Sequence, residues 1–471
     1  MSYAPVTLQS YEPQTDIDLY LPQALLRKWK LAPSSLTVQF GGKTAKAKVD
    51  GVQQSRKALI RPSLAKALHL PKGVPLLVRF HASQQRLVFG PYLGILVSTY
   101  NAHYPLSPFG SFTSFFDEVT DSCQKRGGVV CVFRMQDVDW NAGTVKGMVR
   151  RNGAWRQVLL PLPQCIYNRM VSRQLEQSDA MSDWKQRCRE ADIPFFNEQF
   201  LNKWHVHAAL ENEPEAAQHL PQTIRYEGLQ DLHTMLNSYQ TIYAKPSNGS
   251  MGRGIARIRR INNGYQLHYA GGRSLRFGTI GDLHRHLNRK TKGKAYLLQQ
   301  GLPLIGINQR PTDFRVLVQK DRQGEWKVTS MVARLGQNRI VSNVSRGGSM
   351  TTPATALRMC GPWMTANRPS VQTLHGIALK LSQLLEQSLS GHYAEFGIDL
   401  GVDVRGNVWL LEVNSKPSKT KNSLPMQEGE QEPSFRKIRP SASRMLDYAS
   451  YLSGFPRSGK GSQAPKKPRR R

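Results

Sequence analysis

The sequence predicts an α+β protein built from three globular parts and a basic tail. Its 471 residues allow about three domains at roughly 150 residues each. Short alternating runs dominate residues 1–90, a strand–helix–strand pattern starts near residue 91, and strands mixed with amphipathic helices fill residues 197–455. Hydrophobic residues are 39% of the chain and charged residues 21%, which excludes collagen-like and wholly disordered classes.

Residues 1–90 are predicted to form a small β-rich domain. Pro62–Leu70 is expected as a short helix with Ser63 as its cap. The expected strands are short runs between turn signals: Val38–Phe40, Ala45–Val49, Val74–Phe80 and Arg86–Phe89. Because this part carries no recognisable chemistry, we expect a structural or docking role.

Residues 91–196 are predicted to form an α/β domain. Buried-strand signals at Leu93–Val97 and Gly128–Phe133 enclose the helix-like stretch Ser111–Arg126, and this order predicts parallel strands. A hairpin is expected around Asn152-Gly153.

Residues 197–455 are predicted to form one larger α+β domain, with a lid at about 222–298. A helix is expected from Asn202 to Leu210 and an amphipathic helix over Val371–Ser388. The expected strands are Thr241–Lys245, Gly254–Arg260, Ala295–Gln300, Phe314–Gln319, Trp326–Arg334, Ala394–Val402 and Val408–Val413. Residues 456–471 are rich in Gly, Ser, Pro, Lys and Arg and are expected to be disordered.

The charge balance points to a polyanionic partner or location. Lys and Arg number 65 against 33 Asp and Glu, a net charge of +32, so nucleic acid, an anionic wall or coat polymer and an acidic substrate are all candidates. No nucleic-acid module is evident, which argues against sequence-specific nucleic-acid binding. No apolar run predicts a membrane span. Five cysteines without a CxxC pair favour reduced thiols in the cytoplasm.

A glycine-rich loop is the first motif with chemistry. Lys245 follows a strand and opens a stretch with glycines at 249, 252 and 254. Such a loop can turn tightly and direct backbone N–H groups at phosphate oxygens, and Lys245 would add a positive charge. The alternative is a flexible hairpin tip.

Two acids and an amide form the second motif. Glu412 and Asn414 point to one face of a strand, and a two-residue turn at Arg405-Gly406 would place Asp399 opposite Glu412. Carboxylates at a cross-strand distance of roughly 5 Å repel each other unless a cation lies between them. Three oxygen donors on one face suit Mg²⁺; the alternative is a solvated hairpin.

Cationic residues lie between these two motifs. Arg315, in the run Asp313-Phe314-Arg315, and Arg334 are expected on paired strands, and Asn343 opens a Gly-rich loop. Arginines beside a triphosphate can stabilise charge during phosphoryl transfer. The alternative for each is a surface charge in a basic protein.

In this order the motifs resemble the ATP-grasp superfamily and, more closely, the YheC/YheD family of endospore coat-associated proteins. The hinge of that pattern would be Leu298–Leu302. Other runs that carry the resemblance are Leu93–Leu96, Tyr167–Arg169, Asn202–Trp204, Lys245-Pro246 and the DFRVLVQ stretch from Asp313. The resemblance implies two α+β lobes that clamp a nucleotide, preceded by an α/β pre-grasp domain.

The resemblance also implies the ligands and residue roles. It implies ATP and Mg²⁺, with Mn²⁺ as an alternative, and activation of a carboxylate through an acyl phosphate by a ligase of the carboxylate-amine or carboxylate-thiol type. The nucleotide-binding residues would be Lys203, Lys245, Ser250, Met251, Gly252, Gln299, Gln300, Gly301 and Leu302. Metal ligands would be Asp399, Glu412 and Asn414, while Arg315, Arg334 and Asn343 would face the transferred group.

The resemblance leaves three points open. The hinge has no acidic residue to hold the ribose, so that contact is unassigned. The acceptor could be an acidic small molecule or polymer, and spore-coat components are further candidate partners, with the protein in the cytoplasm or at the spore coat. A non-catalytic coat protein that keeps the fold, and a polyanion binder driven by charge, are the alternatives to an enzyme.

Overall fold

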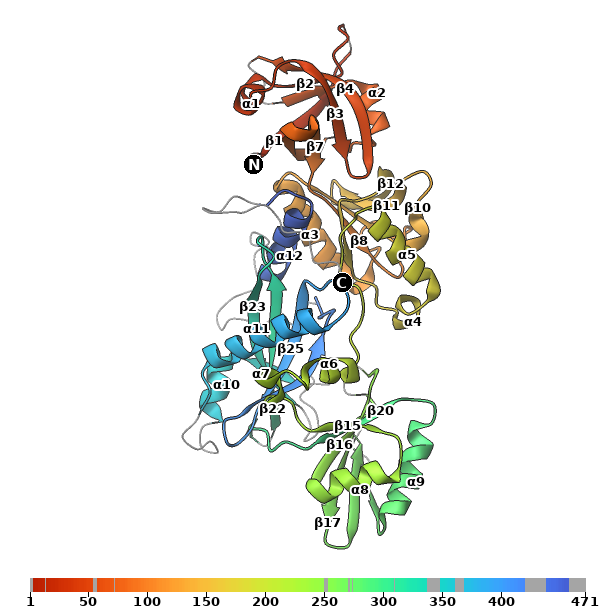
Figure 1. The fold of residues 1–471 in the computed structure, drawn as a ribbon, viewed down its shortest axis with the longest axis vertical. Helices are drawn as coiled ribbons and strands as arrows, with labels where there is room; N and C mark the ends of the chain where they lie inside the picture. Colours follow the sequence, from red (N-terminus) through yellow and green to blue (C-terminus); the bar gives the residue numbers. More distant parts are fainter. Residues whose placement is uncertain are drawn as a thin grey trace.

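A computed structural model shows the strands of the described residues arranged in four sheets along the molecule (Figure 1). The structure describes residues 3–12, 14–53, 57–71, 73–249, 253–269, 272, 274–308, 310–336, 348–360, 368–419 and 438–456. A barrel lies at one end of the molecule and a six-stranded sheet with two helices at the other (Figure 1).

The N-terminal sheet is a closed barrel in the order β1-β5-β2-β4-β3-β7-β6. Leu36, Val38 and Phe40 alternate into its core, as a half-buried strand requires. The helix α2 (Pro62–Ala67) starts with proline and has no side-chain cap, so the predicted Ser63 cap is wrong. The other elements are β1 (Tyr3–Ser10), β2 (Leu19–Pro22), α1 (Gln23–Trp29), β3 (Ser34–Phe40), β4 (Lys43–Val52), β5 (Lys57–Ile60), β6 (Pro75–His81) and β7 (Arg86–Gly90).

The second sheet is mixed, in the order β10-β11-β9-β8-β13-β14, and β12 pairs with β11. Leu93 of β8 pairs in parallel with Val130 of β9, which confirms the predicted parallel unit. The Asn152-Gly153 hairpin is confirmed by pairing of β11 with β12. Its elements are β8 (Tyr92–Leu96), α3 (Thr113–Lys125), β9 (Val129–Phe133), β10 (Val138–Asp139), β11 (Thr144–Arg151), β12 (Ala154–Pro161), β13 (Cys165–Asn168), α4 (Arg173–Glu176), α5 (Asp179–Glu190) and β14 (Phe195–Phe196).

The third sheet, here called the lid sheet, is antiparallel in the order β15-β20-β16-β17-β18-β19. Ile242, Ile258 and Leu267 pack with leucines of α8 and α9 in one core, so both helices cover the same face. The elements are β15 (Thr223–Tyr226), α8 (Leu229–Ser238), β16 (Thr241–Pro246), β17 (Ala256–Ile261), β18 (Gly264–Tyr269), β19 (Ser274–Phe277), α9 (Ile280–Thr291) and β20 (Tyr296–Gln300).

The fourth sheet, here called the large sheet, has the order β24-β23-β22-β25-β26, with β21 paired to β22. The helix α11 has the predicted bounds, Val371–Ser388, and buries Leu374, Ala378 and Leu381. The elements are α6 (Lys203–Leu210), α7 (Pro214–Ala217), β21 (Gly306–Ile307), β22 (Arg310–Lys320), β23 (Trp326–Leu335), β24 (Ser349–Thr351), α10 (Pro353–Met359), α11, β25 (Glu395–Val402) and β26 (Val408–Asn414).

The helix α12 (Pro440–Leu452) joins the parts of the molecule. Its Met445, Leu446 and Ala449 complete a core with strands of the second sheet, and Figure 1 shows α12 beside α3. Just beyond it, Arg79 of the barrel donates to the Gly454 carbonyl, and Tyr3 contacts the Phe455 ring edge to face at 6.1 Å. The sequence did not predict this role.

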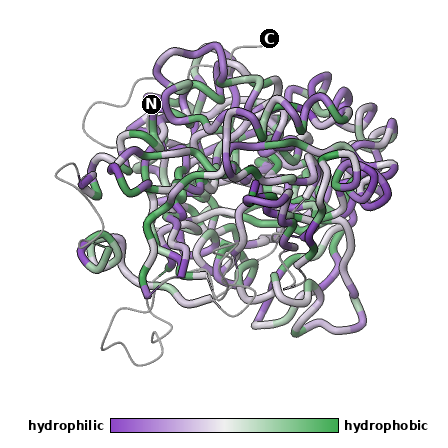
Figure 2. The backbone as a smooth tube through the Cα atoms, turned by 90° about the horizontal axis from the view of Figure 1, so that it is seen from below, coloured by the Kyte–Doolittle hydropathy of each residue, from purple (hydrophilic) through white to green (hydrophobic). Residues whose placement is uncertain are grey.

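Hydropathy and thiol chemistry agree with a folded globular chain. Figure 2 shows hydrophilic and hydrophobic segments alternating along the backbone, with many of the outermost loops hydrophilic. All five cysteines are free and buried, and burial raises the pKa of the Cys131 and Cys165 thiols to about 12. Among the described helices, none has the length and apolarity needed to cross a membrane.

Candidate nucleotide and metal site

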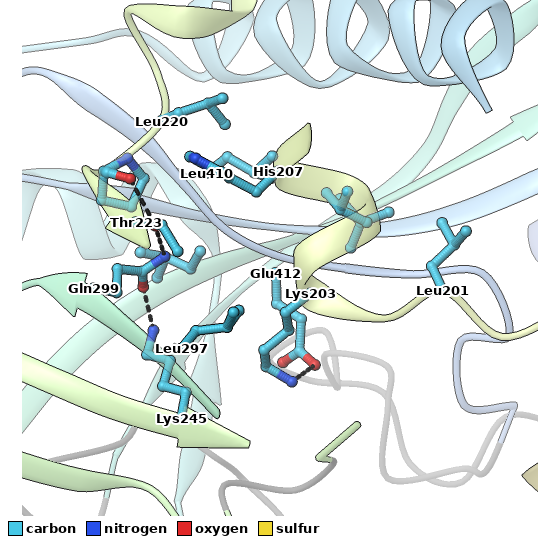
Figure 3. Close-up of a pocket in the computed structure, with 14 residues that line it drawn as sticks. Leu201, Lys203, His207, Leu220, Thr223, Lys245, Leu297, Gln299, Leu410 and Glu412 are labelled. Carbon is cyan, nitrogen blue, oxygen red and sulfur yellow. Dashed lines mark hydrogen bonds and ion pairs between the residues drawn. The ribbon is translucent and has the colours of Figure 1, made fainter. Parts of the chain in front are cut away.

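A pocket lies between the lid sheet and the large sheet (Figure 3). Its walls come from α6, from β15, β16 and β20 of the lid, and from β26 of the large sheet. Three charged side chains that the sequence singled out line it: Lys203, Lys245 and Glu412. The structure therefore brings the predicted phosphate-binding lysines and one predicted metal ligand to the same cavity.

Lys203 sits at the first turn of α6. The helix starts there because Asn202 caps it, accepting a hydrogen bond from the His205 N–H at 2.8 Å. The Lys203 ammonium donates to Glu412 Oε1 at 3.1 Å and to the Gly249 carbonyl at 2.8 Å. This one cation thus contacts both the strand with the metal-ligand candidates and the end of the glycine-rich loop.

Lys245 approaches the same pocket from β16. Its ammonium donates to Gln299 Oε1, and Gln299 Nε2 donates to Thr223 Oγ1 at 3.0 Å, as Figure 3 shows. The residue as a whole is half-buried, but its ammonium group is enclosed. Burial, reinforced by the charge of Lys203 and opposed by Glu412, lowers the pKa of Lys245 to about 8.

Two ammonium groups that share a pocket with one carboxylate leave it with excess positive charge. Burial is the main cause of the lowered pKa of Lys245, and the charge of Lys203 adds an electrostatic cost. A polyanion such as a di- or triphosphate would remove that cost, because it supplies the missing negative charge.

Asp399 pairs directly with Glu412 across β25 and β26, as predicted. The strand register that produces this pairing differs from the predicted one, however. Near the turn Val402 pairs with Val408, and an irregularity between Asp399 and Leu400 shifts the register by one residue. A β-bulge of this kind inserts one residue into one strand, and without it Asp399 would not face Glu412.

Asp399 is buried and bound by two arginines. Arg315 contacts both of its oxygens, with Nη2 2.7 Å from Oδ2, and Arg334 Nη2 donates to Oδ2 at 2.8 Å. Arg334 also binds Asp313 through two bonds of 2.6 and 2.7 Å. Burial alone would raise the pKa of Asp399, but the two arginines outweigh it and hold that pKa below its ordinary value.

The predicted metal ligands fit a hard cation in the chemistry of their donors. Glu412 and Asn414 lie two apart on β26, and Asn414 is opposite Gly397. The buried Asn414 Nδ2 has no hydrogen-bond partner, and because amide oxygen and nitrogen are interchangeable by a flip, this amide can turn its oxygen into the site. Among the described residues no group of three His, Cys, Asp or Glu lies close enough to hold a metal ion, at this site or at any other.

The hinge is more constrained than the resemblance implies. The Gln300 N–H donates to the Gln222 carbonyl and the Gly301 N–H to the Thr241 carbonyl, both at 2.8 Å. Neither N–H is therefore available to a base without local rearrangement. Leu302 accepts from the Leu304 N–H at 2.9 Å, so its contact with adenine stays a prediction.

Four predicted site residues lie outside the described part of the chain. They are Ser250, Met251, Gly252 and Asn343.

A buried charge cluster that the sequence did not predict lies just beyond Asn414. Lys419 donates to Glu395 at 2.6 Å, and Tyr167 donates to the other oxygen of Glu395 at 2.6 Å. Arg169 adds an ion pair at 3.4 Å. These cations lower the pKa of Glu395 although burial raises it. The cluster anchors the chain after β26 to the second sheet.

A second buried pair lies three residues earlier. Lys416 pairs with Glu176, which also accepts from Asn168 Nδ2 at 3.0 Å. Burial lowers the pKa of Lys416 to about 8, although Glu176 opposes the shift. The only sequence signal was a lysine-rich run after Asn414, which also fits a solvated loop.

These features define the class of protein. Two α+β lobes enclose a pocket with paired lysines, beside a strand pair bearing Asp399 and Glu412. A family model described as "YheC/D like ATP-grasp" matches residues 192–452. The chain belongs to this ATP-grasp family, which confirms the predicted fold class.

Two curated relatives from Bacillus subtilis (strain 168) are similar to the chain. Endospore coat-associated protein YheD is 31% identical over 372 residues, covering 77% of this chain and 80% of that protein. Endospore coat-associated protein YheC is 22% identical over 279 residues, covering 57% of this chain and 74% of that protein.

Solved structures show weaker likeness. D-cycloserine synthetase DcsG is 11% identical with a TM-score of 0.44, covering 76% of this chain and 99% of that one. D-alanyl-alanine synthetase A from Vibrio cholerae O1 biovar eltor str. N16961 is 9% identical with a TM-score of 0.43, covering 77% and 98%. Likeness at this level carries no conclusion about activity.

Proposed function

We propose that this protein binds MgATP in the pocket between its lid and large sheets and uses it to activate a carboxylate. The observation that carries the proposal is the convergence of Lys203 and Lys245 in one pocket, where the pKa of Lys245 is lowered to about 8. Two lysines held this way are poorly balanced by protein groups and well balanced by phosphates.

The residue roles follow the pocket. Lys203 and Lys245 would bind the phosphates, with Ser250, Met251 and Gly252 above them and the hinge at Gln299–Leu302 beside the base. Asp399, Glu412 and Asn414 would hold Mg²⁺ or Mn²⁺, which would neutralise phosphate charge. Arg315 contacts both oxygens of Asp399. If Asp399 holds the metal ion, Arg315 must therefore share this carboxylate with the ion or move away from it.

The reaction we propose is that of a carboxylate ligase. A substrate carboxylate oxygen attacks the γ-phosphorus of ATP, ADP leaves, and an acyl phosphate results. An amine or thiol then attacks the carbonyl carbon and phosphate leaves. Arg315, Arg334 and Asn343 would stabilise the transferred phosphoryl group or orient the acidic substrate. No side-chain nucleophile is needed, because positioning and charge stabilisation provide the rate enhancement.

The names of the relatives support a role in spore formation. Both are called endospore coat-associated proteins, so we propose that this chain acts during sporulation, in the cytoplasm or at the coat, on an acidic small molecule or polymer.

A second candidate function is a coat protein that keeps the fold without turnover. One observation favours it. Both oxygens of Asp399 are already bound by Arg315 and Arg334, and Lys203 already pairs with Glu412. These groups satisfy one another without a ligand, as a purely structural role requires.

Thermal unfolding with nucleotide distinguishes the two candidates. A ligand that binds only the native state stabilises it by mass action, so ATP with Mg²⁺ should raise the unfolding midpoint more than ATP with EDTA. Glu412→Gln should remove the Mg²⁺-dependent part. Glu325→Gln is a matched control on an exposed hairpin tip and should respond like the wild type.

Three outcomes are informative. No stabilisation of the wild type by ATP refutes nucleotide binding. Stabilisation without ADP release, across a panel of carboxylates with amines or thiols, favours the structural candidate. A full Mg²⁺ response in Glu412→Gln refutes the metal assignment.

A further inference from the structure

The lid contains a long stretch without acidic residues. No Asp or Glu occurs between Asp231 and Asp282, whereas seven lysines and arginines do. The two flanking acids act locally: Asp231 accepts from the backbone N–H groups before α8 at 2.7 and 2.8 Å, and Asp282 pairs with Arg285. The intervening strands therefore carry a positive charge that nearby acids do not balance.

This charge gathers on the face of the lid sheet opposite α8 and α9. Strand register places Arg257 between Tyr243 and His268. It places Arg259 opposite Gln266, which in turn is opposite Arg276. We call this surface, formed by the helix-free side of β17, β18 and β19, the outer lid face.

The arginines of the outer lid face can use their positive charge to bind a ligand. Arg259 and Arg276 are exposed and Arg257 is half-buried beside the Tyr243 hydroxyl, whose pKa burial raises. None of the three has an ion pair within the part of the chain that the structure describes. Gln266 donates to Ser274 Oγ at 3.2 Å on this face, so hydrogen-bonding groups lie between the arginines.

The spacing of these arginines matches an extended polypeptide. Alternate residues of a strand are about 7 Å apart and neighbouring strands about 4.8 Å apart. Arg257 and Arg259 thus repeat at the distance at which an extended chain presents alternate side chains. Guanidinium groups bind carboxylates through paired hydrogen bonds.

Aromatic groups argue against nucleic acid as the partner. Tyr265, Tyr269 and Phe277 pack on the helix side of the sheet. Among the described residues, β17, β18 and β19 carry no Phe, Tyr or Trp on the outer lid face, and Tyr243 of β16 adjoins it only beside Arg257. Successive bases would therefore have no row of rings on which to stack.

We propose that the outer lid face docks an acidic polypeptide segment in extended conformation. Lys245 of the pocket and Tyr243 beside Arg257 share β16, so the docked segment would lie next to the nucleotide pocket. This docking does not depend on the proposed ATP chemistry, because it uses different residues and is measured without nucleotide.

The test is binding of a fluorescein-labelled peptide of ten glutamates to the full-length protein, followed by fluorescence anisotropy without nucleotide. The double variant Arg259→Gln/Arg276→Gln should bind about tenfold more weakly, the loss of two exposed charge contacts. The matched control is Arg289→Gln/Lys290→Gln, which removes the same charge from exposed positions on α9 and should stay within about twofold of the wild type.

Three results would overturn the proposal. The first is equal weakening in both double variants, which shows attraction to a basic protein without a defined site. The second is no binding of the peptide by the wild type. The third is that an oligothymidylate of ten nucleotides binds more tightly than the peptide and that Arg259→Gln/Arg276→Gln abolishes this binding. The surface would then be a nucleic-acid site.

Discussion

Nucleotide affinity should depend on pH through Lys245. In the free protein its pKa is about 8 because its ammonium group is enclosed and faces Lys203, with only Glu412 in opposition. Bound phosphates would favour the charged form and return the pKa toward 10.5, the ordinary value of lysine. Binding therefore takes up a proton wherever the free lysine is neutral, and affinity falls as pH rises above 8.

The size of the effect follows from the two pKa values. At pH 8 the free Lys245 is half protonated, so binding should take up about 0.5 proton. Between pH 7.5 and 9.5 the affinity should fall about twentyfold if the bound pKa is the ordinary one. ATP itself changes protonation mainly below this range, so the slope belongs to the protein.

The assay is isothermal titration calorimetry of ATP in two buffers with different ionisation enthalpies, at four pH values. Lys245→Arg keeps the positive charge at every pH and should flatten the profile, even if its affinity is lower. A wild-type profile that is flat from pH 7.5 to 9.5, or a Lys245→Arg profile as steep as the wild type, would refute the reasoning.

Three further changes test other parts of the site. Asp399→Asn leaves Arg315 without its carboxylate partner and Arg334 with Asp313 alone, and should lower the free energy of unfolding by about 3 kcal/mol in urea titrations at pH 7. Since the pKa of Asp399 is lowered, its contribution is present above about pH 4 and lost on acidification; the variant should therefore lose less stability than wild type between pH 5 and 3, and parallel curves would contradict this. Glu395→Gln leaves buried Lys419 undercompensated and should also cost about 3 kcal/mol, which urea unfolding measures; a change under 1 kcal/mol would contradict the cluster's role. Gly301→Ala places a Cβ 2.6 Å from the Thr241 carbonyl oxygen and should lower the calorimetric melting temperature by several degrees. An unchanged melting temperature would show that the hinge backbone shifts to make room for the methyl group.

Features set by neighbouring residues could be predicted from the sequence. The hairpins and α11 follow from hydrophobic period and turn residues, and the Asp399–Glu412 pairing depends on one hairpin. Even there the bulge was missed, although Gly401 directly follows the irregular step at Leu400 and a glycine inside a strand often marks a bulge. The domain boundaries stay a prediction.

Contacts between distant segments could not be predicted. Arg315 reaches Asp399 because β22 pairs with β25, and nothing in either strand's own pattern names its partner. Lys419 shows the same limit, because its burial depends on Glu395 and on the second sheet. A basic residue in a basic sequence gives no local sign that it will be enclosed.

The place of α12 has a consequence for synthesis of the protein. Its Met445, Leu446 and Ala449 share a core with Leu93 and Ile95, which leave the ribosome some 350 residues earlier. Until α12 emerges, α3 covers part of the apolar face of that early sheet through Phe115, Phe116 and Val119, and the part on which α12 packs has no cover. The nascent chain must therefore carry an exposed hydrophobic surface for most of translation, and a chain released before residue 440 would be a substrate for chaperones and proteases.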